Sequence, residues 1–105
     1  MKKVLSANLI KESFKEKVLE VVRGIKSGKV MTYKTVAEKA RNINASRAVG
    51  NFMKANFDNT VPCHRVVRSD GVVGDYNRGG TNKKIEMLKS EGVKFKGSKV
   101  ILANL

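Results

Sequence analysis

The fold is decided by residues 32–56, TYKTVAEKARNINASRAVGNFMKAN. Thr32 is suited to cap a first short helix, YKTVAEKA, because its hydroxyl oxygen can accept a hydrogen bond from the first turn. Asn44 is suited to cap a second helix, ASRAVGNFMKAN, and RNIN forms the turn between them. The apolar residues spaced for the inner sides of the two helices are Val36, Ala37, Ala40, Val49, Phe52 and Met53. Two short helices joined by a tight turn predict a helix-turn-helix.

Helices are also predicted on both sides of this pair. Ser13 and Glu16 have the spacing of a capping box, and Gly28 is suited to end the helix that starts near Ser13. A last helix covers residues 82–92, NKKIEMLKSEG, with Gly92 as its terminator. The apolar residues spaced for the inner faces of these two helices are Phe14, Val18, Leu19, Val22, Ile25, Ile85 and Leu88.

The other stretches are rich in turn residues. Residues 66–80 are irregular and glycine-rich, and VKFKGSKVIL, residues 93–102, has two short runs that predict a hairpin. The chain is thus predicted to be mainly α-helical, a winged helix-turn-helix domain with short strands. Its second helix, Asn44–Ala55, would enter a groove of DNA. The polar side of that helix carries Asn44, Ser46, Arg47, Asn51 and Lys54. A small helical domain with a solvated face is the alternative on this pattern alone.

Charge and length limit the function. The chain has 105 residues, which we expect to form a single domain over residues 1–105, and a formal net charge of +13. So large an excess predicts a polyanionic partner, nucleic acid before a membrane, although a lysine-rich surface can also serve solubility alone. A lone cysteine and the absence of an apolar leader predict a cytoplasmic protein associated with DNA. No stretch approaches the roughly 20 apolar residues of a membrane span.

The chemistry concentrates in residues 59–71, NTVPCHRVVRSDG, which hold the only proline, cysteine and histidine of the chain. A cysteine attacks as its thiolate, and a neighbouring imidazole and cations favour that form. Adjacent side chains usually point in different directions, so Cys63 and His64 would communicate directly in a tight turn or through one water. The alternative is a buried cysteine beside a surface histidine. One cysteine and one histidine fall short of the four usual ligands of zinc, so no metal is expected.

The motif PCHRVV, residues 62–67, resembles the active-site signature of the O6-alkylguanine-DNA alkyltransferases, the methylated-DNA–protein-cysteine methyltransferases. Other segments resemble that family in the same order. They are GKVMTYKTVAEKA, ASRAVGNFMKAN, SDGVVGDYNRGG and KIEMLKSEG. The resemblance covers about residues 13–92. It implies a DNA repair protein that rotates O6-alkylguanine out of duplex DNA and transfers the alkyl group irreversibly, once per molecule.

The resemblance implies five catalytic residues. Cys63 would be the nucleophile and permanent alkyl acceptor, and His64 would take its proton through a water. Glu91 would orient the histidine and complete a relay. Asn56 would brace the active-site turn, and Tyr76 would hydrogen-bond the guanine so that its O6 can leave.

Five further residues would contact DNA by the same resemblance. Arg47 would enter the stack where the base has left, and Tyr33 would press on the phosphate so that the nucleotide rotates. Lys34, Asn42 and Ser69 would touch the strand. The implied partner is double-stranded DNA containing O6-alkylguanine. We expect a monomer with no cofactor and no membrane contact.

The sequence also departs from the family pattern. The family's N-terminal domain is expected to be absent. The loop over residues 56–63 looks one residue shorter than in the family, and the loop after Tyr76 looks one residue longer. Arg78 lies in this second loop, where a wall of the pocket is expected. Alkyltransferase-like proteins carry tryptophan at the position of Cys63 and bind lesions without repair. Such a lesion-binding module, and a winged-helix DNA-binding regulator, are the two alternatives.

Overall fold

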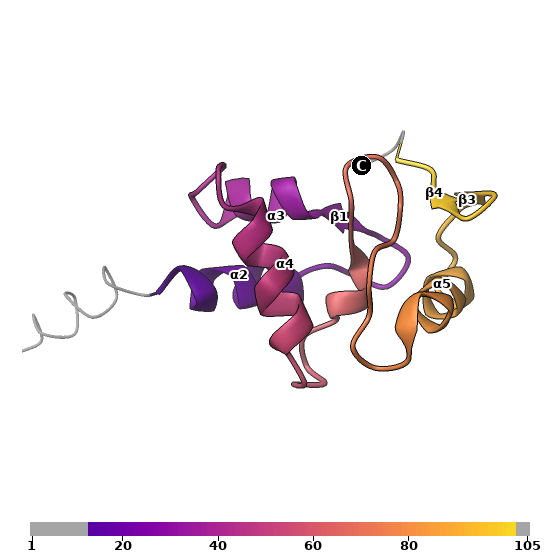
Figure 1. Ribbon diagram of the computed structural model, residues 1–105, viewed down its shortest axis with the longest axis horizontal. Coiled ribbons are helices and arrows are strands. Elements are labelled where there is room, and N and C mark those ends of the chain that lie inside the picture. The colour runs from indigo at the N-terminus through magenta and orange to yellow at the C-terminus, as the bar shows by residue number, and fades with distance from the viewer. Residues whose placement is uncertain (1–12, 103–105) are drawn as a thin grey trace, which may run out of the picture.

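The computed structural model describes residues 13–102, and the expectations for the first twelve residues lie outside this range. Within the described residues, the fold consists of four α-helices and four two-residue strands (Figure 1). The helices are α2 (Phe14–Arg23), α3 (Tyr33–Lys39), α4 (Ser46–Ala55) and α5 (Gly80–Ser90), and a 3-10 turn, η1, covers Cys63–Arg65. The strands are β1 (Met31–Thr32), β2 (Val66–Val67), β3 (Phe95–Lys96) and β4 (Lys99–Val100).

The capping box of α2 is confirmed, but the end of that helix was predicted wrongly. The hydroxyl of Ser13 accepts from the backbone of Glu16, and the Glu16 carboxylate accepts from the backbone of Ser13. The helix ends at Gly24 instead of Gly28, because the Gly24 N–H turns back to the carbonyls of the last turn. Gly28 lies in the following turn with φ +89.

The helix-turn-helix is confirmed in α3 and α4. The Thr32 hydroxyl accepts from the Thr35 N–H at 3.1 Å and caps α3 as predicted. Asn44 does not cap α4, which is a correction. The N-cap is Ala45, whose methyl side chain has no acceptor and so makes no side-chain cap, and its N–H closes a turn onto the Asn42 carbonyl at 3.0 Å. The recognition helix therefore begins at Ser46.

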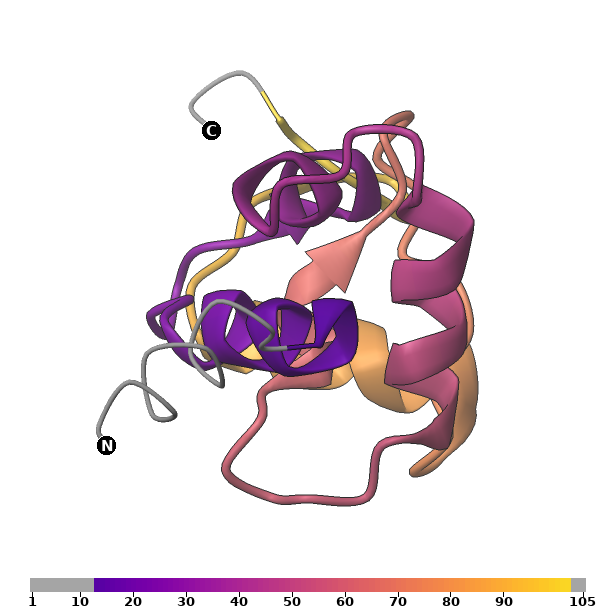
Figure 2. The same cartoon turned by 90° about the vertical axis from the view of Figure 1, so that its left-hand side faces the viewer.

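A parallel strand pair, absent from the sequence-based description, joins the helix-turn-helix to the active-site motif. Met31 of β1 pairs with Val66 of β2, and Thr32 pairs with Val67. This pairing holds the segment after Cys63 against the start of α3. The core beside this strand pair is formed by α2, α3, α4 and the segment around Cys63. Figure 2 shows the arrangement of the three helices from one end of the molecule. Its buried members include Val18, Val22, Val36, Ala37, Val49, Met53, Val61, Cys63 and Val66.

The last helix and the hairpin form a second, smaller core. α5 begins at Gly80, two residues before the predicted start, and buries Leu88. The predicted hairpin is confirmed, with β3 antiparallel to β4 and Phe95 paired with Val100. The buried residues of this core are Val30, Val67, Val73, Leu88, Val93 and Val100. Nowhere in residues 13–102 is a helix long and apolar enough to cross a membrane.

Candidate active site

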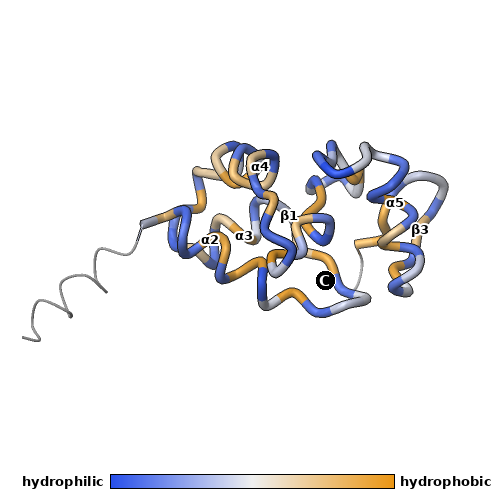
Figure 3. The backbone as a smooth tube through the Cα atoms, turned by 90° about the horizontal axis from the view of Figure 1, so that it is seen from below, coloured by the Kyte–Doolittle hydropathy of each residue, from blue (hydrophilic) through white to orange (hydrophobic). Residues whose placement is uncertain are grey.

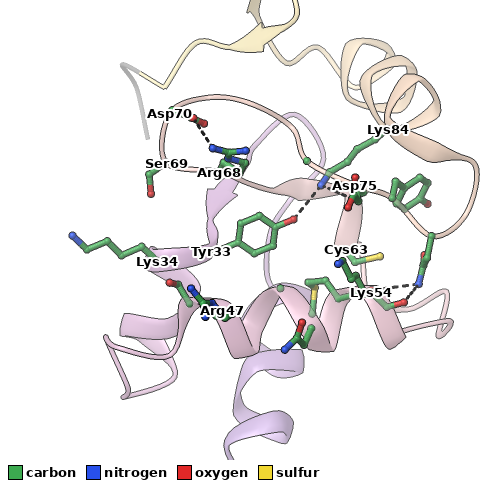
Figure 4. Close-up of a pocket in the computed structure, with 17 residues that line it drawn as sticks. Tyr33, Lys34, Arg47, Lys54, Cys63, Arg68, Ser69, Asp70, Asp75 and Lys84 are labelled. Carbon is green, nitrogen blue, oxygen red and sulfur yellow. Dashed lines mark hydrogen bonds and ion pairs between the residues drawn. The ribbon is translucent and has the colours of Figure 1, made fainter.

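A pocket of about 940 Å³ opens between α3, α4, the loop that follows β2, and α5 (Figure 4). Six of the ten residues predicted for the site line it. They are Tyr33, Lys34, Arg47, Cys63, Ser69 and Tyr76. The other four do not line it. Asn42 lies in the turn before α4, and the remaining three are Asn56, His64 and Glu91. Segments far apart in the sequence thus converge on one thiol.

The thiol is held by a tight local turn. Pro62 precedes η1, the Cys63 N–H donates to the Val61 carbonyl at 2.8 Å, and the Arg65 N–H donates to the Pro62 carbonyl at 3.0 Å. Cys63 is 4% exposed, yet it is part of the pocket wall. A ligand in the pocket can therefore reach a thiol that bulk water hardly touches.

His64, the next residue after the thiol, contacts the Glu91 carboxylate. His64 Nε2 is 3.0 Å from Glu91 Oε2, and Arg65 grips both oxygens of the same carboxylate at 3.0 and 2.8 Å. The Arg65 guanidinium, with smaller help from His64, holds the pKa of Glu91 below its usual range. The ionised carboxylate accepts the Nε2 proton, which leaves Nδ1 of a neutral imidazole free to accept a proton.

Asn56 braces the chain ahead of the thiol rather than the thiol turn itself. Its amide donates to the Asp58 carbonyl at 3.3 Å and accepts from the Asp58 N–H at 3.2 Å. Asn77, which the sequence did not lead us to expect at the site, binds the backbone where α4 ends and this segment begins. Its amide nitrogen lies 2.6 Å from the Lys54 carbonyl and 2.8 Å from the Asn56 carbonyl. These contacts satisfy carbonyls that the end of α4 leaves open.

The two tyrosines of the pocket are kept in the protonated form. Burial raises the pKa of Tyr33, and burial likewise raises the pKa of Tyr76. The Tyr76 ring stands edge-on to His64, with ring centroids 6.4 Å apart. A protonated phenol beside the thiol can donate to an oxygen or nitrogen of a bound base, in keeping with the predicted role of Tyr76.

Lys84 is a pocket-lining residue that the sequence did not lead us to expect. It is 1% exposed, and its Nζ donates to the Tyr33 hydroxyl at 3.4 Å and to the Asp75 carbonyl at 3.3 Å. Burial lowers the pKa of Lys84 to about 8, while negative charge on Cys63 or Asp75 would raise it. The signal in the sequence was its position four residues before Leu88, on the apolar face of α5.

The predicted DNA-contacting residues do not all gather at the pocket. Arg47, Lys34 and Ser69 are exposed at its rim, where they can meet a nucleic acid strand. Asn42 is exposed in the turn between α3 and α4 and does not line the pocket. Tyr33 lies in the wall with its hydroxyl toward Lys84 (Figure 4).

Arg78 does not form the expected wall of this pocket, which is a correction. Its Nη1 donates to Asn59 Oδ1 at 2.6 Å, and its guanidinium lies over the Phe57 ring at 5.9 Å. It lines a smaller cavity of about 340 Å³ on the side of His64 and Tyr76. Arg78 thus ties the loop after Tyr76 to the loop over residues 56–63.

Nothing within residues 13–102 groups three His, Cys, Asp or Glu side chains as a metal site would require. The pocket is lined by a thiol, two phenols and a buried ammonium, and an imidazole held by a carboxylate follows the thiol in sequence. These groups suit a nucleophilic attack in which a proton is removed from sulfur and a leaving group is stabilised.

Comparisons with known proteins identify the family of the chain. The family model "6-O-methylguanine DNA methyltransferase, DNA binding domain" covers residues 13–93. The methylated-DNA–protein-cysteine methyltransferase of Rattus norvegicus is 40% identical over 84 residues, which is 78% of this chain and 40% of the relative.

Two solved structures have the same fold. The structure of S. pombe Atl1 in complex with damaged DNA containing O6-carboxymethylguanine is 30% identical, with a TM-score of 0.70 over 83% of this chain and 84% of that one. Mycobacterium tuberculosis OGT in complex with DNA is 32% identical, with a TM-score of 0.70 over 75% of this chain and 48% of that one. The chain spans less than half the length of the rat and M. tuberculosis proteins.

Proposed function

This chain belongs to the 6-O-methylguanine DNA methyltransferase family by its DNA-binding domain, and from that premise we propose that it repairs O6-alkylguanine in duplex DNA by accepting the alkyl group on Cys63. The observation that carries the proposal is the thiol in the pocket wall, next in sequence to an imidazole that lies 3.0 Å from the Glu91 carboxylate. The proposal includes a single domain that acts as a monomer.

Binding precedes chemistry. The exposed cations at the rim meet phosphates, and α4 lies along a groove of the duplex. The reactive alkyl carbon is inaccessible to a thiol while its base is stacked, so the base is rotated into the pocket at a cost of a few kcal/mol. Arg47 fills the vacated position in the stack, and Tyr33 and Lys34 engage the strand.

The transfer itself balances within the site. The Cys63 proton passes to Nδ1 of His64, directly or through one water, and Glu91 stabilises the imidazolium. The sulfur attacks the alkyl carbon, so that an S–C bond forms as the C–O6 bond breaks. The electron pair leaves with the guanine, whose developing charge is stabilised by a hydrogen bond from Tyr76. The product thioether is stable to hydrolysis, and each molecule reacts once.

Lys84 assists from within the wall. Its ammonium lines the same pocket as the Cys63 thiol, and negative charge on Cys63 raises the pKa of Lys84. Its contact with the Tyr33 hydroxyl also fixes that ring beside the pocket. The charge is costly to bury, which is typical of residues kept for function.

The proposal is tested by intact mass after mixing the protein with duplex DNA containing O6-methylguanine. We expect a gain of one methyl group on the protein. No gain despite tight binding of the lesion duplex would instead support a lesion-binding module.

That second candidate rests on the likeness to S. pombe Atl1, whose structure was solved in complex with damaged DNA containing O6-carboxymethylguanine. A gel shift that prefers lesion DNA, together with an unchanged protein mass, is its signature. Tight binding to one operator sequence with indifference to the lesion would point to a winged-helix regulator.

A further inference from the structure

The β3–β4 hairpin carries positive charge without a counter-charge of its own. Residues 92–102 contain Lys94, Lys96 and Lys99 and neither aspartate nor glutamate. Because side chains alternate along a strand, Phe95 and Val100 face the second core while the lysines face outward. All three lysines are exposed, and the colouring of Figure 3 shows hydrophilic positions in this part of the chain.

The register of the hairpin works against its stability. Lys96 and Lys99 are cross-strand partners, so their side chains leave the same face side by side. Like charges directly opposite each other destabilise a strand pair. The turn between them needs Gly97 at φ +63, so the register is fixed by the backbone. A local cost that the fold does not require is typical of a functional surface.

The hairpin is also fastened to the rim of the pocket. The Val100 N–H donates to the Gly71 carbonyl at 2.8 Å, and Lys99 pairs with Val72 in an antiparallel bridge. The same loop carries Ser69 and Asp70 on the pocket rim, and the hairpin passes above them in Figure 4.

The acidic residue of the neighbouring loop, Asp70, already has a partner, so it leaves the hairpin lysines available for phosphates. Asp70 is already paired with Arg68 at 3.1 Å. The Val72 N–H holds the pKa of Asp70 below its usual range, and the positive charges of Arg68 and Lys99 add to this effect. Lys99 therefore adds a cation to a rim whose own acid already has a partner.

We propose that Lys96 and Lys99 form a second phosphate-binding surface, which engages the DNA backbone on one flank of the rotated base while α4 holds the lesion site. The inference rests on the proposed function, since it takes duplex DNA as the partner. Phosphates would relieve the repulsion between the two ammonium groups. Release of counterions then adds affinity that is independent of sequence.

The test compares three double variants by the dependence of duplex affinity on salt concentration. Lys96→Gln with Lys99→Gln should reduce the log–log slope by about 1 to 2, because each phosphate contact contributes about 0.9. Lys26→Gln with Lys29→Gln is the matched control. It removes the same charge from the exposed loop between α2 and β1, on the side opposite α4 in Figure 2, and its slope should stay near that of the wild type. Lys96→Arg with Lys99→Arg should keep the wild-type slope.

A second measurement locates the contact. One flank of a lesion duplex is shortened step by step, and then the other. The affinity difference between wild type and the glutamine hairpin variant should vanish on shortening one flank and persist on shortening the other. The hairpin variant should melt no lower than wild type, since it loses a like-charge pair.

The outcomes are separable. Equal slope changes in the hairpin and control variants, or a deficit that depends on neither flank, would overturn the second surface while leaving repair intact. Salt-independent or absent binding of the wild-type protein would overturn the proposed function itself, and the hairpin inference with it.

Discussion

Replacing Lys84 by methionine should make the protein more stable and less reactive. Burial lowers the pKa of Lys84 from 10.5 to about 8. A difference of about 2.5 pKa units corresponds to about 3 kcal/mol of cost for the charged form in the folded state. Methionine keeps the length of the buried stem, and the variant loses two long hydrogen bonds of about 0.5–1 kcal/mol each. The expected net gain at neutral pH is about 1–2 kcal/mol.

The pH dependence of this gain provides the sharper test. The folded pKa of Lys84 lies below the unfolded value, so the unfolded chain binds more protons between about pH 8 and pH 10.5. The cost is therefore complete below about pH 8 and fades as pH rises. The stability advantage of Lys84→Met should shrink by about 2 kcal/mol between pH 7 and pH 9.5. Urea unfolding of both proteins at the two pH values measures it.

The same variant has a kinetic readout. Loss of the ammonium removes a positive charge from the wall of the pocket that holds the thiol, so alkyl transfer from free O6-benzylguanine should slow. A methionine variant that is less stable at pH 7, or whose stability difference is the same at both pH values, would refute the cost assigned to the buried charge. An unchanged rate of alkyl transfer would show that Lys84 has no part in the chemistry.

Three other predictions follow from the same contacts. Glu91→Gln should slow transfer from free base and from duplex DNA by similar factors. It should also flatten the acid limb of stability, because the depressed pKa of Glu91 stabilises the fold above about pH 4.3 and is lost as pH falls; stopped-flow rates and urea titrations check both. Arg47→Ala should slow the duplex reaction far more than the free-base reaction, and equal losses would remove its role in the stack. Gly71→Ala should lower the free energy of unfolding by more than about 2 kcal/mol, because Gly71 has φ +88 and an added Cβ would lie 2.7 Å from the Val100 carbonyl oxygen. Gly92→Ala should lower it by about 1 kcal/mol, because Gly92 has φ +92 but open space around the Cβ. Equal losses in urea titrations would contradict this reasoning.

The sequence predicted the helix-turn-helix because its signals are local. The Thr32 cap, the capping box at Ser13 and the helical spacing of the valines each lie within a few residues, and the structure confirms them. The helix boundaries were less predictable. Gly24 and Gly28 can both end a helix, and only the packing of the segment that follows decides between them.

Contacts between residues far apart in the sequence could not be predicted from the sequence. Strands of two residues, such as β1 and β2, have no measurable alternation, and their parallel pairing spans the whole helix-turn-helix. Lysine is usually exposed, so Lys84 was not taken as buried despite its place on the apolar face of α5. The contact between Arg78 and Asn59 joins two loops that meet only in the folded chain.

The roles assigned to the site residues stay predictions, although the distances favour several of them. His64 and Glu91 are in direct contact, and Tyr76 lies beside the thiol in the same pocket. Asn42 lies away from the pocket, so a contact with DNA there would have to come from the turn before α4.

The most direct test of the account is to locate the transferred group. The protein is mixed with an excess of O6-methylguanine duplex and digested with trypsin, and the peptide over residues 55–65, ANFDNTVPCHR, is analysed by mass spectrometry. We expect one methyl group on Cys63 of this peptide, one equivalent per protein molecule, and none in Cys63→Ser, which should still bind the duplex. An unmodified Cys63 peptide from protein that binds the lesion tightly, or methyl transfer that persists in Cys63→Ser, would contradict the mechanism.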